Sequence, residues 1–318
     1  MDEAVLRAQQ IARGIVANIE QVIVGKSKAI ELAVIGLISH GHLLIEDAPG
    51  VGKTMLARAL AKSVNCSFKR IQFTPDMLPG DITGVTVYNQ KTSEFEFRPG
   101  PIMANMVLAD EINRATPRVQ SALLECMEER QVSIDGVTHR MPAPFHVLAT
   151  QNPIEYEGTF PLPETQLDRF LMRINLGYPT LKEEITIMEK QQFVHPIDQI
   201  AAVTNCAELV SLQEAVKKIY VDGLVKEYIA TIVEATRDNP SIYLGASPRG
   251  SLALFRTSQA RALMYGREFV LPDDVKALAE TVLAHRLVLH SLNGSNDRSG
   301  RSNIAELLAK VPVPGMVP

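Results

Sequence analysis

The chain has 318 residues, enough for a sizeable core in two domains or one large one. Its 46% hydrophobic and 21% charged residues are ordinary for a globular protein and exclude wholesale disorder, collagen and a coiled coil. The 32 basic and 36 acidic residues give a net charge of −4, so no global positive field would attract nucleic acid. The longest charge-free stretches, 32–45 and 141–154, fall short of the roughly 18 apolar residues that a membrane span needs.

The N-terminus and the cysteines predict a cytoplasmic protein. The first residues carry two acids and lack a basic region followed by an apolar core, so no secretory signal is expected. Cys66, Cys126 and Cys206 are an odd number and lie far apart in the sequence. This spacing favours reduced core thiols over a disulfide framework or a structural metal site.

The first part of the chain predicts two helices followed by a strand, a turn and a helix. Apolar residues recur at helical spacing over 5–15 and again over 30–37. The apolar run 42–46 then predicts a strand, and residues 53–64 predict a helix. The glycine-containing turn 47–52 between them completes a βα unit.

Strands continue to alternate with helices up to about residue 180. A helix is predicted over 117–130, where Thr116 can cap and Pro117 suits the first helical position. This alternation favours a parallel sheet with helices on both faces. The further strand candidates are 68–73, 106–109, 146–150 and 170–174.

Two β-hairpins and a second domain complete the predicted organisation. The hairpins, 85–97 and 132–138, interrupt the strand and helix alternation. Helix signals then dominate, among them Ser247-Pro248 and Pro272 at helix starts. We expect an α/β core over 1–180, a linker over 181–206 and a smaller all-α lid over 207–318. Within the lid we expect a polar loop near 291–303 and a loose tail.

A phosphate-binding loop is predicted at Gly50-Val51-Gly52-Lys53-Thr54, directly after a strand and at the start of a helix. Small residues let backbone N–H groups surround a phosphate, Lys53 can reach the β- and γ-phosphates, and the Thr54 hydroxyl can bind Mg²⁺. Asp47 stands where the general pattern has its first glycine. An acid so near phosphates must point away from them.

Two further groups follow predicted strands. Asp110 and Glu111 come after the run 106–109, and Asn152 comes after the strand 146–150. The carboxyl ends of parallel strands meet at one edge of a sheet, where ligands of open α/β sheets bind. One acid can hold Mg²⁺, the next can activate water, and an amide can orient that water. Without the phosphate loop, a solvated strand end would explain these residues as well.

Longer stretches resemble the MoxR family of AAA+ ATPases over nearly the whole chain. They are 45–54, which contains the phosphate loop, 108–115, 158–164 and 167–170. The resemblance implies an ATPase with ATP or ADP and Mg²⁺ as ligands, a Walker A loop at 50–54 and Walker B at Asp110 and Glu111. It also implies sensor 1 at Asn152, an arginine finger at Arg169 and sensor 2 at Arg249. Further nucleotide contacts are implied at Val24, Gly25, Pro49 and Met55.

Without the resemblance, the sequence gives weaker support for a role of Arg169 and Arg249 at the nucleotide. An Arg beside an Asp near a strand start, as Arg169 is, is more often part of a surface ion pair than of a catalytic site. Arg249 lies in the first turn of a predicted helix, which is unfavourable for a cation unless an anion such as a phosphate is near. The resemblance instead implies that both arginines contact a bound nucleotide.

The resemblance further implies a homo-oligomeric ring, a hexamer, with a chaperone-like action on a client protein. A protein with a von Willebrand factor A domain is an implied partner. Three alternatives remain: the ATPase subunit of a magnesium chelatase, a nucleic-acid motor, and a scaffold that binds ATP without hydrolysing it. The predicted hairpin tips, 89–91 and 135–136, carry one cation and one anion, which argues against nucleic acid.

Overall fold

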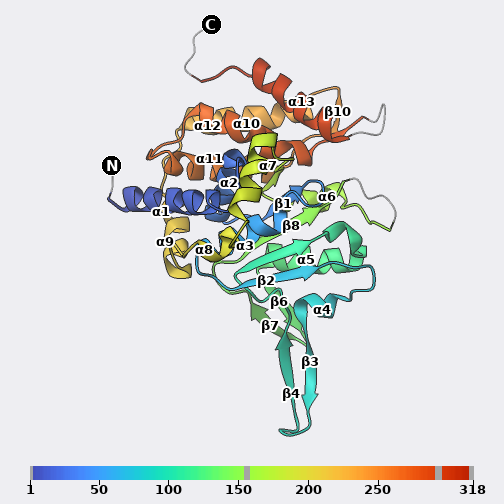
Figure 1. The fold of residues 1–318 in the computed structure, drawn as a ribbon. Coiled ribbons are helices and arrows are strands. Elements are labelled where there is room, and N and C mark those ends of the chain that lie inside the picture. The colour runs from blue at the N-terminus through green and yellow to red at the C-terminus, as the bar shows by residue number, and fades with distance from the viewer. Residues whose placement is uncertain (1–2, 154–157, 291–295, 315–318) are drawn as a thin grey trace.

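The computed structural model describes residues 3–153, 158–290 and 296–314. Its centre is a five-stranded, fully parallel sheet in the order β2-β5-β8-β1-β9 (Figure 1). The predicted parallel sheet is confirmed, and the ends of its five strands lie within two residues of the predicted ends. The strands are β1 (Leu43–Glu46), β2 (Phe68–Gln72), β5 (Met106–Asp110), β8 (His146–Gln151) and β9 (Met172–Ile174).

Helices cover both faces of this sheet, as predicted. Because side chains alternate along a strand, neighbouring residues enter different cores. Leu43 and Leu108 pack in one hydrophobic cluster with α1 (Glu3–Glu20), α2 (Ser27–Ile38) and α3 (Lys53–Ser63). Leu44 and Val107 pack in a second cluster. That cluster includes α4 (Pro79–Thr83) and α5 (Pro117–Glu129).

Helix α5 begins as predicted with Pro117 in its first turn, but the expected cap is wrong in detail. Thr116 occupies the N-cap position with extended backbone, yet its side chain accepts no hydrogen bond there. The Thr116 carbonyl instead accepts bonds from the amides of Val119 and Gln120. Proline supplies no N–H, so one of the unsatisfied donors of the first turn is already removed.

The two predicted hairpins are present and lie side by side. The longer one, β3 (Gly84–Asn89) with β4 (Glu94–Pro99), projects from the body on the side away from the C-terminal helices (Figure 1). The shorter one pairs β6 (Gln131–Ile134) with β7 (Val137–Arg140). The Phe97 and His139 rings stack with centroids 3.9 Å apart, so the hairpins support each other.

The segment predicted as a linker contains two helices, α7 (Leu181–Lys190) and α8 (Pro196–Gln199). Helix α7 begins with a capping box, in which Thr180 accepts a bond from the Glu183 amide and Glu183 accepts one from the Thr180 amide. No residue of α7 is buried. The segment is therefore helical, although much of its surface faces solvent.

The C-terminal part is helical, with two departures from the prediction. Strands β10 (Ile242–Leu244) and β11 (Val288–Leu289) form a small antiparallel pair, so this part is not all-α. The polar stretch 296–303 is not a loop, because it opens helix α13. Residues 291–295 and 315–318 of the expected loop and tail lie outside the described residues. The helices are α9 (Cys206–Lys217), α10 (Gly223–Arg237), α11 (Pro248–Met264), α12 (Pro272–Leu283) and α13 (Asn296–Lys310).

The C-terminal helices pack on the N-terminal helices of the same chain. The Gln213 side chain of α9 donates to the Leu37 carbonyl of α2 at 2.8 Å. Arg13 of α1 donates to the Met264 carbonyl at the end of α11, also at 2.8 Å. Buried residues from both parts belong to one hydrophobic cluster. These contacts fix the position of α11 relative to the sheet.

The expectation of three reduced cysteines is wrong for two of them. Cys66 and Cys206 are joined in a disulfide, with Cα atoms 5.7 Å apart and a separation of 140 positions in sequence. The bond links the turn after α3 to the first residue of α9. Cys126 is free and only 2% exposed, and burial raises the pKa of its thiol to about 12. Its thiol therefore stays protonated and unreactive at neutral pH.

We expect loss of the disulfide to destabilise the fold. A bond that closes so long a loop restricts the unfolded chain, and native disulfides typically contribute about 2–4 kcal/mol. The double variant Cys66→Ser, Cys206→Ser should lose about that free energy of unfolding in denaturant titrations without reductant. Dithiothreitol should destabilise the parent protein similarly and leave the double variant unchanged. A parent protein indifferent to dithiothreitol would contradict this expectation.

Candidate nucleotide site

The glycine loop between β1 and α3 leaves open space at the start of a helix. Gly50 and Gly52 have φ angles of 80° and 100°, which other residues rarely adopt. A Cβ atom added to Gly50 would meet nothing within 4 Å, and one on Gly52 would meet only Ile23 at 4.0 Å. Helix α3 begins at Lys53, so the N–H groups of its first turn and its positive end point toward this space. The arrangement suits a phosphate group.

Asp47 and Lys53 hold the loop in shape. The Lys53 side chain is 8% exposed, and its Nζ donates to the Asp47 carbonyl at 2.7 Å. The Asp47 carboxylate accepts from the Leu176 and Gly177 amides beyond β9, both at 2.7 Å. The acid therefore points away from the open space, as the sequence analysis required, and ties the loop to the neighbouring strand end.

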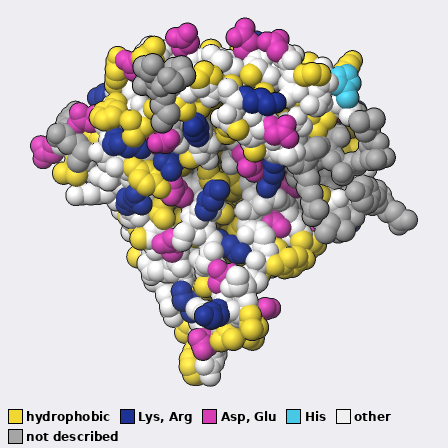
Figure 2. Space-filling model, turned by 90° about the horizontal axis from the view of Figure 1, so that it is seen from above, with side chains coloured by type: hydrophobic (Ala, Val, Ile, Leu, Met, Phe, Trp, Pro, Cys, Tyr) yellow, Lys and Arg dark blue, Asp and Glu magenta, His cyan; other side chains and the backbone are white. Residues whose placement is uncertain are grey.

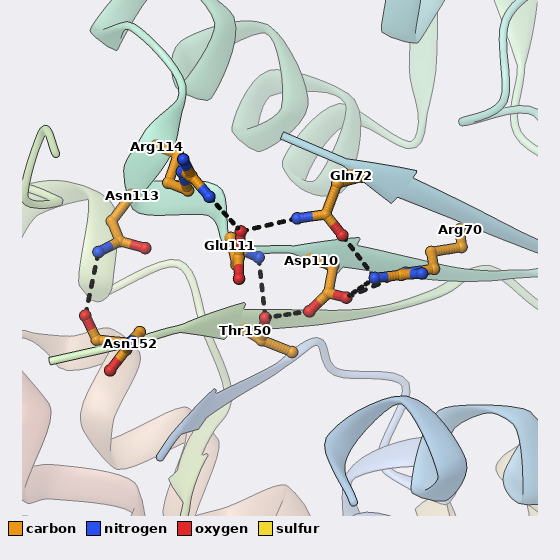
Figure 3. A network of polar contacts seen from close by, with 8 residues as sticks. All are labelled: Arg70, Gln72, Asp110, Glu111, Asn113, Arg114, Thr150 and Asn152. Atoms are coloured by element: carbon orange, nitrogen blue, oxygen red, sulfur yellow. Dashed lines mark hydrogen bonds and ion pairs between the residues drawn. The ribbon is translucent and has the colours of Figure 1, made fainter. Parts of the chain in front are cut away.

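The acidic pair lies at the same edge of the sheet, at the end of β5 (Figure 3). The Thr150 hydroxyl donates to Oδ1 of Asp110 at 2.6 Å, and Arg70 donates to Oδ2 at 2.7 and 3.0 Å. Glu111 has φ 59° and accepts from the Gln72 side chain at 2.7 Å and from Arg114 at 3.1 Å. Both carboxylates are thus held in fixed positions by neighbouring strands and by the short helix after β5.

Asn152 follows β8 and lies at this edge too. It is 3% exposed, and its carbonyl accepts from the Asn113 side chain at 3.2 Å (Figure 3). The preceding residue, Gln151, is paired in register with Glu46 at the end of β1. The structure therefore brings together the glycine loop, the acidic pair and Asn152, which were predicted from separate parts of the sequence.

Sequence reasoning missed the residues that orient the acids. Arg70 and Gln72 lie on β2 with their side chains on β5, and Thr150 reaches across from β8. The strand pattern of 68–73 was recognised, but it does not say which strand lies next to it. The available signal was the spacing of Arg70 and Gln72, which are two positions apart and therefore lie on the same face of the strand.

Gly25 lies on the opposite side of the glycine loop from the acids, at the rim of a cavity of about 340 Å³. Its φ is 73°, and an added Cβ would collide with the Glu183 side chain. Asn175 and Leu176 beyond β9, and Ala284 after α12, also line this cavity. Val24 is half-buried, while Pro49 is exposed and Thr54 and Met55 are half-buried. The cavity lining does not include the glycine loop itself.

Arg169 and Arg249 do not lie at this edge. Arg169 precedes β9, whose Met172 is paired with Leu43 at the start of β1. It therefore lies at the edge opposite the glycine loop, separated from it by a strand length of roughly 13 Å. Arg249 is in the first turn of α11, where Ser247 caps the helix as predicted. Both arginines line one cavity with His40, which precedes β1.

Arg169 does not form the surface ion pair with the neighbouring Asp168 that its place in the sequence suggests. Its neighbour Asp168 does not pair with it but with Arg286, at 3.2 Å. Arg169 and Arg249 both pair with Glu128 near the end of α5. The two predicted nucleotide-contacting arginines are therefore close to each other, and within one chain neither approaches the glycine loop.

Comparison with known proteins agrees with this geometry. Residues 42–172 match the model of the ATPase family associated with various cellular activities (AAA), and residues 234–307 match the AAA lid domain. A crystal structure of a candidate ATPase from Cytophaga hutchinsonii has a TM-score of 0.90 at 37% identity, covering 98% of this chain and 97% of that one. The fold and the sheet-edge site thus define an AAA ATPase with a helical lid.

Three relatives narrow the class of ATPase. The chain is 45% identical to Chaperone MoxR1 of Mycobacterium tuberculosis over 86% of its own length and 74% of that protein. It is 32% identical to Protein MoxR of Methylorubrum extorquens, covering 86% of each chain. YeaC of Bacillus subtilis is 51% identical over 94% of this chain and 93% of that one. The chain belongs to the MoxR family of AAA ATPases.

The described residues contain neither a membrane-spanning helix nor a metal-binding cluster. None of the helices in those ranges is long and apolar enough to span a bilayer. The same residues contain no group of three or more His, Cys, Asp and Glu that could hold a metal ion.

Proposed function

We propose that this protein hydrolyses ATP at the interfaces between subunits of a ring and uses the cycle to remodel or activate a client protein. The observation that carries this proposal is the separation of the site into two halves. The glycine loop, Asp110, Glu111 and Asn152 share one edge of the sheet, whereas Arg169 and Arg249 share the other. A site assembled from two chains accounts for both halves.

The first half has the chemistry to bind ATP with Mg²⁺. Backbone N–H groups of 50–54 and the Lys53 ammonium would hold the phosphates. A hydroxyl and a carboxylate are ligands that Mg²⁺ accepts together with phosphates and water, so Thr54 and Asp110 would hold the ion. When bound, the ion neutralises charge on the phosphates. The Thr150 and Arg70 contacts hold the Asp110 carboxylate in place for this role.

Glu111 and Asn152 would act on the attacking water. The Glu111 carboxylate can accept a proton from water, and the Gln72 and Arg114 contacts set its direction. Asn152 can orient the same water through its side chain. Val24, Gly25, Pro49, Val51 and Met55 would complete the nucleotide contacts on the other side of the loop.

Arg169 and Arg249 would act in trans. A head-to-tail ring presents the arginine edge of each subunit to the glycine loop of the next, which supplies every site with one copy of each residue. An arginine on the transferred phosphoryl stabilises the charge that develops there. We propose a hexamer, following the family resemblance.

The proposal also includes the kind of molecule on which the ATPase acts, which is a client protein. A relative at 45% identity is named a chaperone, which supports a protein client here, and we include a von Willebrand factor A domain protein as a partner. We also propose a cytoplasmic location, although the Cys66–Cys206 disulfide removes the support that reduced cysteines gave to it. The magnesium chelatase alternative requires chelatase partners, and the scaffold alternative leaves the ordered Glu111 without a purpose.

A protein client, and not nucleic acid, should stimulate the ATPase. Basic and acidic side chains are interspersed on the face seen in Figure 2, and the long hairpin carries only Lys91 as a cation at its tip. Phosphate tracking needs several adjacent cations. We expect ATPase assays at physiological salt to be unchanged by single- or double-stranded DNA or RNA. Several-fold stimulation that disappears as salt is raised would support the nucleic-acid motor instead.

A further inference from the structure

Glu128 lies between the two arginines of the second half of the site. Its Oε2 is 3.3 Å from Nη1 of Arg169, and its Oε1 pairs with Nη2 of Arg249. The three side chains come from α5, the turn before β9 and the first turn of α11. All three are partly exposed, so an anion from outside the chain could reach them.

Glu128 is the carboxylate that pairs with both arginines. Glu125 and Glu129 line a second cavity with Arg169, but within the described residues they form no ion pair with it. The cavity that both arginines line, about 240 Å³, is lined by five arginines and two carboxylates. The other carboxylate, Asp168, is already bound by Arg286 at 3.2 Å and by the Ser247 hydroxyl at 2.9 Å. Without Glu128, Arg169 and Arg249 would face each other in a region of excess positive charge.

We propose that Glu128 is a resident substitute for the neighbouring subunit's γ-phosphate. This inference rests on the proposed function, because it requires Arg169 and Arg249 to act in trans. A guanidinium donates the same N–H groups to a carboxylate as to a phosphate. While the next site is empty or holds ADP, Glu128 keeps the two arginines together. When ATP binds there, its γ-phosphate displaces the carboxylate.

Displacement should weaken the binding of ATP, but not of ADP. Partly exposed ion pairs are weak, so the γ-phosphate can compete successfully, yet breaking two of them offsets part of the affinity for ATP. ADP lacks the γ-phosphate and leaves the pairs intact. Glu128 would thus set how strongly the ring discriminates between the two nucleotides.

The test is the ratio of ATP to ADP affinity in rings that cannot hydrolyse. In a Glu111→Gln background, adding Glu128→Gln should tighten ATP binding by about threefold to tenfold at equilibrium and leave ADP binding unchanged. Glu129→Gln is the matched control, because this neighbour on α5 has no ion pair in the part of the chain that the structure describes. The gain should vanish when Arg169→Ala and Arg249→Ala are also present.

Two results would overturn this role of Glu128: unchanged ATP affinity in the Glu128→Gln rings, or equal tightening for ATP and ADP. A ratio measured within one preparation does not depend on the fraction of folded protein, so a folding defect cannot imitate either result. Failure of the trans proposal is detected separately, by the absence of rescue between Lys53→Ala and Arg169→Ala subunits. If those subunits rescue each other while the Glu128→Gln rings show unchanged ATP affinity, only the proposed role of Glu128 is contradicted.

Discussion

Replacing Glu111 with Gln should leave ATP bound but reduce turnover by a factor of about 10² to 10⁴. The amide keeps the size of the side chain and can still contact Gln72, but it cannot accept a proton from the attacking water. Lys53→Ala should instead weaken nucleotide binding, because it removes the ammonium beside the glycine loop. Nucleotide titrations and steady-state hydrolysis measured on both variants separate the two effects.

An exposed acid far from both halves of the site provides the control for this pair. Glu227 lies on α10 among the C-terminal helices, so Glu227→Gln should change neither binding nor turnover. Hydrolysis at the parent rate by the Glu111→Gln protein would show that Glu111 does not activate water. The same Glu111→Gln protein should retain its client in the presence of ATP, so proteins that co-purify with it would identify the client class.

The fold could be predicted wherever the residue pattern of a single segment indicates its secondary structure. Apolar runs ended by glycine or polar turns marked the central strands β1, β5 and β8, because a buried parallel strand is apolar on both faces. Helix α13 was missed because Ser, Asn, Gly and charged residues dominate its first half. Buried Ile304 and Leu307 in its second half hold it against the lid, so tertiary packing outweighed composition. The disulfide was missed because its cysteines become neighbours only after the lid packs.

The candidate site was predictable on one edge only. Parallel strands deliver the residues that follow them to the same edge, so the glycine loop, Asp110, Glu111 and Asn152 could be grouped from sequence. The position of Arg249 depends on how α11 packs on α1 and α2, which no periodicity records. Glu128 is one of three acids on α5, and only the packed structure distinguishes it from Glu125 and Glu129.

The placement of the glycine loop and the arginines at opposite edges of the sheet predicts that two kinds of inactive subunit should restore activity when mixed. Lys53→Ala and Arg169→Ala rings should each be nearly inactive, since a trans arginine contributes about 10³ to 10⁵ in rate in GTPases. Mixed and allowed to exchange, they should recover activity. An Arg169→Ala subunit keeps its own Lys53 and receives Arg169 from a Lys53→Ala neighbour. With equal mixing, about a quarter of the interfaces are complete in a head-to-tail ring.

The structure also supplies the control that makes this result interpretable. Arg249→Ala should rescue Lys53→Ala in the same way, because Arg249 shares an edge with Arg169. Glu111→Gln should not, because Glu111 shares an edge with Lys53, and no interface in that mixture contains both groups. Hydrolysis in exchanged rings is therefore expected for two pairs and absent for the third. Absence of recovery with both arginine variants, in rings shown to have exchanged, would mean that the arginines serve their own chain or only its structure.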